Sequence, residues 1–198
     1  MGEPDPIRNE RRARTRDASR AAILDSARRV AARDGARNLS LRGVAAEAGY
    51  APAALYGYFA SKDELLLALA AEDLSALSRA MRDAVTADGG VTKLAAASAA
   101  ALTLLRDNET FAAAQGALPS EAGGSEAERL FNGRMIAVLK VLADATGQPA
   151  NSRDAQCDVV LVAAALTGLA MLARSGRLGA LGFTPEEILA RLDGRFTS

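Results

Sequence analysis

The spacing of hydrophobic residues predicts helices along almost the whole chain. Between residues 18 and 34, apolar residues recur every three or four positions, which gives one apolar face; they are Ile23, Leu24, Ala27, Val30 and Ala31. Gly35 follows where this helix is expected to end, and Ser40 is a suitable N-cap for the next one. Val, Ile and Thr do not gather into alternating runs typical of strands. The pattern predicts an all-α protein.

Longer helices are predicted after residue 61. Ser61 and Glu64 have the spacing of a capping box, which marks the start of a helix. From there the sequence predicts helices at about 62–86, 91–106, 108–116, 125–145, 152–175 and 185–192. The segment 152–175 is apolar nearly all round, so it must be covered on every side. A second subunit is a natural cover, and a central position within one chain is the alternative.

A short helical pair is predicted between Leu41 and Phe59. Gly49 lies where the chain must bend, and glycine accepts a positive φ there without strain. Pro52 suits the first turn of the second helix, expected at about 52–59. Two helices joined by a short glycine turn are typical of the helix-turn-helix unit that reads DNA.

Composition narrows the class of protein. The 198 residues are 49% hydrophobic and 4% aromatic, which fits one or two helical domains. Cys157 is the one cysteine, so an intrachain disulfide is excluded and a cytoplasmic location is expected. The first 20 residues are polar and show no secretory signal. The longest apolar run, 159–173, is shorter than the roughly 18 residues of a membrane span, so no membrane partner is expected.

Charge is unevenly distributed along a chain whose formal net charge is zero. Residues 1–62 carry 12 Lys and Arg against 7 Asp and Glu, whereas residues 63–198 carry 12 against 17. A basic N-terminal region on an acidic remainder favours a polyanion partner at one end. Chance partition of solvated charges is the alternative, and the helix-turn-helix favours DNA.

Catalytic chemistry finds little support in the sequence. Histidine is missing, which removes the commonest general base and metal ligand, and Cys157 has no histidine to activate it. The pairs Gly89-Gly90 and Gly123-Gly124 do not belong to a phosphate-binding loop, because the GxxxxGK(S/T) pattern is absent. We expect no enzyme activity, no metal site and no cofactor.

The N-terminal region resembles a known family. The order and spacing of residues between Thr15 and Leu69 are similar to the DNA-binding domain of the tetracycline-repressor-like (TetR) family of bacterial regulators. The positions that carry the resemblance are Thr15-Arg16, Ile23-Leu24, Ala27, Gly35, Ser40-Leu41, Val44-Ala45, Ala48-Gly49, Leu55-Tyr56, Tyr58-Phe59 and Ser61-Lys62.

The resemblance implies candidate DNA contacts. Four residues match positions that commonly touch phosphates: Ser40, Tyr56, Tyr58 and Lys62. Tyr50 and Ala51 match positions near bases or backbone. The second helix has few hydrogen-bond donors, so base reading is expected to depend on Arg42, on methyl contacts from Ala53 and Ala54 to thymine, and on DNA shape. Arg42 as an ordinary solvated residue is the alternative.

The sequence organises into three parts: a flexible basic arm at 1–16, a DNA-binding domain at 17–62 with the helix-turn-helix at about 40–59, and a ligand-binding and dimerisation domain at 63–198. The resemblance implies a homodimer through helices at about 125–145 and 152–175, and a small-molecule effector. Weak candidates for effector contacts mix apolar and polar groups: Phe111, Gln115, Phe131, Asn132, Arg134 and Met135.

Together these features predict a homodimeric repressor that binds an inverted-repeat operator in double-stranded DNA and leaves it when the effector binds. The alternative is a helical protein that binds a small molecule without specific DNA recognition.

Overall fold

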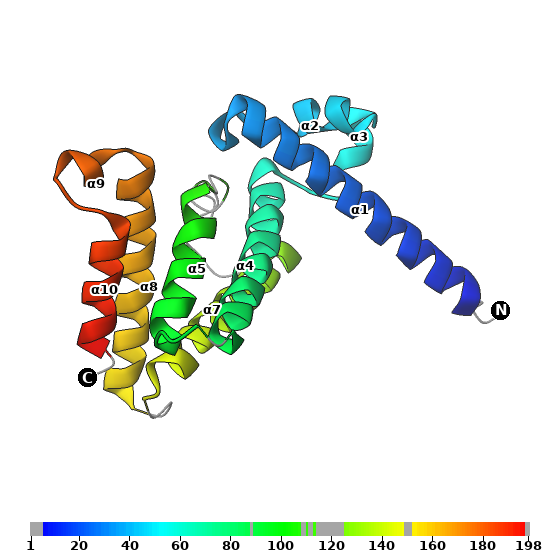
Figure 1. The fold of residues 1–198 in the computed structure, drawn as a ribbon. Coiled ribbons are helices and arrows are strands. Elements are labelled where there is room, and N and C mark those ends of the chain that lie inside the picture. Colours follow the sequence, from blue (N-terminus) through cyan, green and yellow to red (C-terminus); the bar gives the residue numbers. More distant parts are fainter. Residues whose placement is uncertain are drawn as a thin grey trace.

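The structure, a computed structural model, describes residues 6–87, 89–107, 110, 113, 125–148 and 152–196, with side chains from residue 8 onward. Every regular element in these ranges is a helix, which confirms the all-α class. Helices α1 to α3 form a small head above a larger body that contains α4 to α10 (Figure 1).

The head contains α1 (Pro6–Asp34), a 3-10 turn (Ala36–Asn38), α2 (Leu41–Ala48) and α3 (Pro52–Leu55). Helix α1 begins earlier than expected, because residues 6–16 are helical where a flexible arm was predicted. Five of these eleven residues are Arg, which favours helix once the downstream turns have nucleated it. Gly35, at φ 82°, stops α1 as predicted.

The body contains α4 (Lys62–Thr86), α5 (Lys93–Asp107), α7 (Glu126–Thr146), α8 (Arg153–Arg174), α9 (Arg177–Ala180) and α10 (Pro185–Phe196). These bounds agree with the predicted helices to within a few residues. The exceptions are α9, which lies in a Gly-rich stretch where no helix was predicted, and the predicted helix at 108–116, most of which lies outside the described residues.

Helix α4 joins the head to the body. The Ser61 hydroxyl accepts a hydrogen bond from the Glu64 N–H at 3.1 Å, and the Glu64 carboxylate accepts one from the Ala60 N–H at 2.6 Å. The start of α4 is therefore capped, although the return bond reaches one residue beyond the usual capping-box position. Residues 65–71 are buried without interruption, and one hydrophobic core runs from the head into the body.

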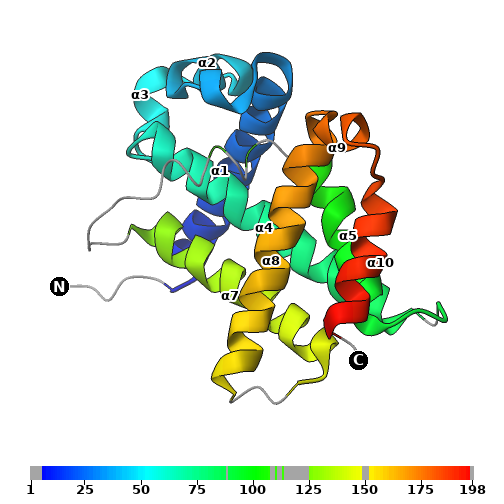
Figure 2. The same ribbon diagram turned by 90° about the vertical axis from the view of Figure 1, so that its left-hand side faces the viewer.

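Helix α8 is only partly covered by its own chain. It packs against α5, α7, α9 and α10, and Figure 2 shows its outer side facing the viewer between α7 and α10. Six of its 22 residues are buried, so its own chain does not cover the helix on every side, and the alternative of a central position within one chain is disfavoured. Among the described residues, α8 is also the one helix whose length and mean hydropathy of 1.8 suit a membrane span.

The uncovered side of α8 carries a continuous row of small and apolar residues. They recur at helical spacing and are exposed or half-buried, and together we call them the α8 stripe: Val160, Leu161, Ala164, Ala165, Gly168 and Met171. A row of this kind on a water-exposed helix marks an interaction surface.

Candidate nucleic-acid interface

Local hydrogen bonds define the helix-turn-helix. The Ser40 hydroxyl accepts from the Gly43 N–H at 3.1 Å and so begins α2. Gly49 ends α2 in the left-handed conformation at φ 72°, and its N–H bonds back to the carbonyls of α2. The turn between α2 and α3 thus has the geometry that the sequence predicts, because glycine, which lacks a Cβ, adopts this conformation without strain.

The two helices are fixed by the side chains between them. Val44 and Ala45 on α2 and Leu55 on α3 are fully buried, and Phe59 lies in the same core. Three side chains around them, Arg42, Ala53 and Ala54, stay exposed. The packing therefore holds an outward-facing surface on a rigid base, which is the arrangement that DNA reading requires.

Helix α3 is shorter than predicted. It covers Pro52–Leu55, and residues 56–58 form a turn instead of continuing the expected helix to 59. Ala51 offers no side-chain cap at the start, and Gly57 weakens the helix at the end. Both causes are visible in the sequence.

The predicted contact residues gather around this turn. Six of them are exposed on the head: Ser40, Arg42, Ala51, Ala53, Ala54 and Tyr56. Tyr56 is 61% exposed, which is unusual for a large side chain in a compact domain and leaves its hydroxyl free to reach a phosphate. Ser40 keeps its O–H as a donor while its oxygen caps α2.

Two tyrosines and a lysine are half-buried and have structural partners. The rings of Tyr50 and Tyr58 meet edge to face, with centroids 6.5 Å apart. The Lys62 ammonium donates to the Arg37 carbonyl at 2.6 Å, which ties the 3-10 turn to the start of α4. These contacts keep the three residues at the edge of the candidate interface, where Lys62 retains two further N–H donors.

Two arginines of α1 that were not among the predicted contact residues pack against the turn after α3. Arg16 donates to the Gly57 carbonyl at 3.0 Å, and its guanidinium lies 5.5 Å from the centre of the Tyr58 ring. The guanidinium of Arg20 lies 5.1 Å from the centre of the Phe59 ring. Their spacing of four residues places both on one face of α1, and this was the available clue. They fasten α1 to the turn that follows α3.

Ion pairs occupy the other end of α1. Arg29 and Arg33 donate to the two oxygens of Glu47 at 2.9 and 3.0 Å, and these hydrogen bonds lower the pKa of the Glu47 carboxyl. Arg28 donates to Glu72 at 2.7 Å and to Asp73 at 3.3 Å. Partial burial lowers the pKa of Arg28, but the two carboxylates have the larger effect together, so the pKa of Arg28 is raised. These pairs connect α1 to α2 and α4.

The effector candidates do not converge on one site. Met135 lines a small apolar cavity of about 40 Å³ between α4, α5, α7 and α8. Phe131 is buried in the core, whereas Asn132 and Arg134 are exposed on α7. Phe111 and Gln115 lie outside the described residues. Within the described residues, no group of three or more Cys, Asp and Glu is placed to hold a metal ion.

Comparison with known proteins agrees with this geometry. The sequence model of the family described as bacterial regulatory proteins, tetR family, matches residues 23–69. The chain is 41% identical over 76 residues to the HTH-type nicotine-responsive transcriptional repressor HdnoR of Paenarthrobacter nicotinovorans. That match spans 38% of this chain and 39% of the length of HdnoR.

Solved structures extend the likeness over nearly the whole chain. The candidate regulatory protein SCO4313 is 21% identical, with a TM-score of 0.69 over 93% of this chain and 97% of its own. A regulatory protein of the tetR family from Rhodococcus RHA1 is also 21% identical, with a TM-score of 0.61 over 90% and 95% of the two chains. At these identities the structures establish the fold, and the motif of the head supplies the family. Residues 23–69 are therefore a DNA-binding domain of the tetR family of bacterial regulatory proteins, and the chain as a whole shares the fold of the solved regulators.

Proposed function

We propose that this chain is a homodimeric repressor that binds an inverted-repeat operator and is released by an apolar small molecule. The family is one of transcriptional regulators and not of enzymes. The observation that carries the proposal is the outward-facing surface around α3, held on the buried residues Val44, Ala45 and Leu55. A regulator of chromosomal genes would work in the cytoplasm.

The contact residues would divide the work of DNA binding. Ser40, Tyr56, Tyr58 and Lys62 would hold phosphates, with Tyr50 and Ala51 close to the backbone or bases. Arg42 would reach a guanine edge, and the methyl groups of Ala53 and Ala54 would contact thymine. Phosphate contacts set the register, so the short α3 would leave most of the sequence selection to Arg42 and to DNA shape.

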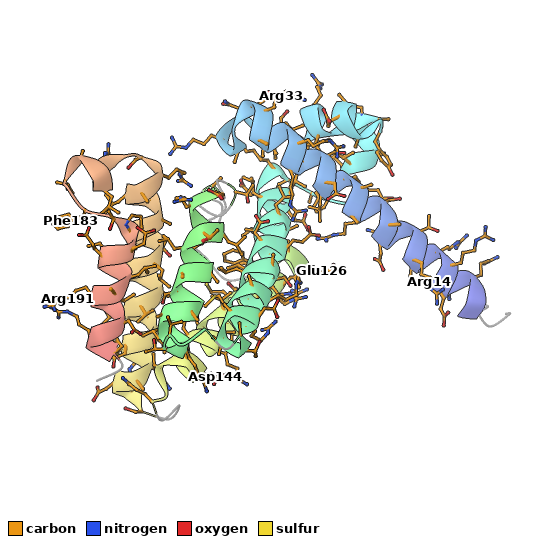
Figure 3. The ribbon with its side chains drawn as sticks, viewed as in Figure 1. Arg14, Arg33, Glu126, Asp144, Phe183 and Arg191 are labelled. Carbon is orange, nitrogen blue, oxygen red and sulfur yellow. The ribbon has the colours of Figure 1, made fainter. Side chains whose placement is uncertain are left out.

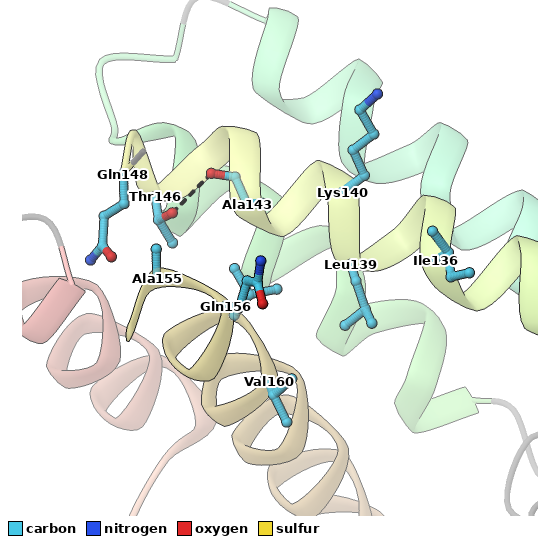
Figure 4. A pocket seen from close by; sticks show the side chains of 10 residues that line it. Ile136, Leu139, Lys140, Ala143, Thr146, Gln148, Ala155, Gln156 and Val160 are labelled. Carbon is cyan, nitrogen blue, oxygen red and sulfur yellow. Dashed lines mark hydrogen bonds between the residues drawn. The ribbon is translucent and has the colours of Figure 1, made fainter. Parts of the chain in front are cut away.

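The α8 stripe supports the dimer. Val160 and Leu161 are 57% and 58% exposed in the single chain, and burying such residues is favourable. An apolar groove of about 330 Å³ continues from the stripe to α7, lined by Val160, Ile136 and Leu139 among others (Figure 4). A second copy seated here would cover α7 and α8, as the sequence predicts. Helix α8 is long and apolar enough to suit a membrane span, and a second copy would explain this apolar surface by contact with protein.

The inner cavity indicates the character of the effector. Its lining is apolar apart from the Thr167 hydroxyl, which already donates to the Ala163 carbonyl at 2.9 Å. A ligand with many hydrogen-bonding groups would leave them unpaired there, so an aliphatic molecule fits better. A space of about 40 Å³ holds little more than one water molecule, so binding requires the helices to separate. The nicotine response of HdnoR is not carried over, because that match covers little more than a third of either chain.

Selection of sheared genomic DNA by the purified protein at about 0.15 M salt tests the function, because specific complexes outlast nonspecific ones at this salt. We expect a few enriched fragments that share an inverted repeat. The absence of enriched fragments, with or without added cell extract as a source of effector, would favour the alternative of a small-molecule binding protein. Arg42→Ala should retain binding to random duplex and lose discrimination between operator and random sequence; unchanged selectivity would remove Arg42 from base reading.

A further inference from the structure

The two halves of α1 use arginine in different ways. In the C-terminal half, Arg28, Arg29 and Arg33 each meet a carboxylate within 3.5 Å. In the N-terminal half, Arg8, Arg11 and Arg12 are exposed, and none has a carboxylate within 4 Å among the described residues. One exposed pair occurs there, between Arg14 and Glu10 at 3.7 Å. The N-terminal half therefore presents cations that the head does not neutralise.

These cations lie together with part of the candidate interface. An open groove of about 550 Å³ is lined by Arg8, Arg11, Arg12, Thr15, Arg16 and Tyr58, and we call it the arginine groove. Arg16 fastens its floor to the turn after α3, through the Gly57 carbonyl and the Tyr58 ring. The first turns of α1, around Arg14, project beyond α2 and α3 (Figure 3). The groove is thus continuous with the surface around α3 and extends past it.

We propose that the arginine groove binds the phosphate backbone of DNA outside the half-site read by α2 and α3. Four guanidinium groups and a tyrosine hydroxyl are donors that suit phosphate oxygens. From residue 8 to residue 16, a helix rises about 12 Å, and phosphates of one DNA strand advance about 3.4 Å each along the axis. The row can therefore follow about three successive phosphates.

The helical form of the segment decides between two modes of binding. A flexible arm could enter a minor groove, which is about 6 Å wide, but a helix with its side chains is about 10–12 Å across. Helix α1 therefore stays outside the minor groove and contacts the backbone. Contacts of this kind carry affinity without sequence information and weaken as salt rises.

A charge-removal variant tests the proposal. The measurements on the operator rest on the proposed function, whereas those on random duplex do not. Arg8→Ala, Arg11→Ala and Arg12→Ala are combined, and the slope of log affinity against log salt is measured on random duplex and on the selected operator. Loss of three contacts per subunit lowers the slope by about 2.7, or about 5 for a dimer. A change below about 1, the value of one contact, would overturn the proposal.

Two further variants separate local contacts from net charge. Arg79→Ala, Arg82→Ala and Lys93→Ala remove the same charge from exposed positions of the body, and should leave the slope nearly unchanged. An equal fall in this control would overturn the proposal. Replacing Arg8, Arg11 and Arg12 with Lys keeps the charges and should restore most of the slope; failure to restore it would equally contradict phosphate contacts.

Operator length locates the contacts. Removing about 10 base pairs from each flank of the operator should weaken the original protein more than tenfold and the triple Ala variant little. Equal losses in both would place the arginines inside the half-site and overturn the proposal. If no operator is recovered, the proposed function fails, whereas the slopes on random duplex still decide the role of the arginine groove.

Discussion

The head and the body differ in how completely each covers its own hydrophobic residues. Among the described large apolar side chains, ten are exposed, and Tyr56 is the one that belongs to the head. The body exposes the other nine, including Val160, Leu161 and Met171 of the α8 stripe. The head leaves one large apolar side chain exposed, whereas the body exposes an apolar face that a partner could cover.

This difference corresponds to two different physical requirements. The head needs a fixed core to aim a few side chains at DNA, so its buried residues are constrained by packing. In the proposed function the body would both assemble and respond to a ligand, which its open face and small inner cavity suit.

Leu161→Glu should have the largest effect, on assembly. In the proposed dimer the carboxylate would be buried without a partner in both subunits, which weakens the dimer about 1,000-fold, equivalent to about 4 kcal/mol. Sedimentation at a series of protein concentrations measures this. Val91→Glu places the same charge on an exposed Val off the stripe and should remain dimeric. A Leu161→Glu protein that stays dimeric would remove the α8 stripe from the interface.

Leu55→Ala should destabilise the fold through the packing of the head and leave the α8 stripe of the proposed dimer intact. Leu55 is fully buried, so its truncation should cost about 2–5 kcal/mol of stability. Urea unfolding followed by circular dichroism gives the change, and sedimentation checks the dimer. Tyr56→Ala, at the adjacent exposed position, should change stability little and weaken DNA binding. Equal stability losses in the two variants would contradict the division between buried base and exposed contact surface.

Ser61→Ala tests the joint between the two regions. The Ser61 hydroxyl caps α4, and its loss should cost about 1 kcal/mol. Thermal unfolding measures the change, and Ser61→Thr, which keeps the hydroxyl, should recover most of it. Because the hydrophobic core is continuous through α4, head and body should unfold together in both variants. Two separate transitions would show that the regions are energetically independent.

Glu47→Gln should give the smallest effect, confined to acid. Arg29 and Arg33 lower the pKa of Glu47 in the folded protein, so its contribution to stability is present above the ordinary value of 4.5. This contribution of Glu47 to stability is lost as the pH falls below 4.5 and passes through the lower pKa that Glu47 has in the folded protein. The melting temperature of the variant should therefore fall less than that of the original protein between pH 5 and pH 3. Glu186 is an exposed carboxylate for which no ion pair with arginine is found among the described residues. Glu186→Gln should therefore show the same pH dependence as the original protein.

Local chemistry made much of the head predictable from sequence. The caps at Ser40 and Ser61 and the turn at Gly49 are formed by residues within a few positions of one another, so their spacing alone predicts them. The family of the head was recognisable for the same reason, because the helix-turn-helix is a short continuous motif. The sequence also determined the apolar character of α8, through its composition.

The tertiary structure decided which partners distant residues find. Arg28 and Glu72 are 44 positions apart, and Lys62 reaches a carbonyl 25 positions away, so no spacing rule relates them. The arginines of α1 look alike in the sequence, yet packing pairs those of one half and leaves three of the other half exposed. Whether α8 is covered likewise depends on how many helices fit around it. Side-chain partners are set by the fold, since they follow from three-dimensional proximity and not from local propensity.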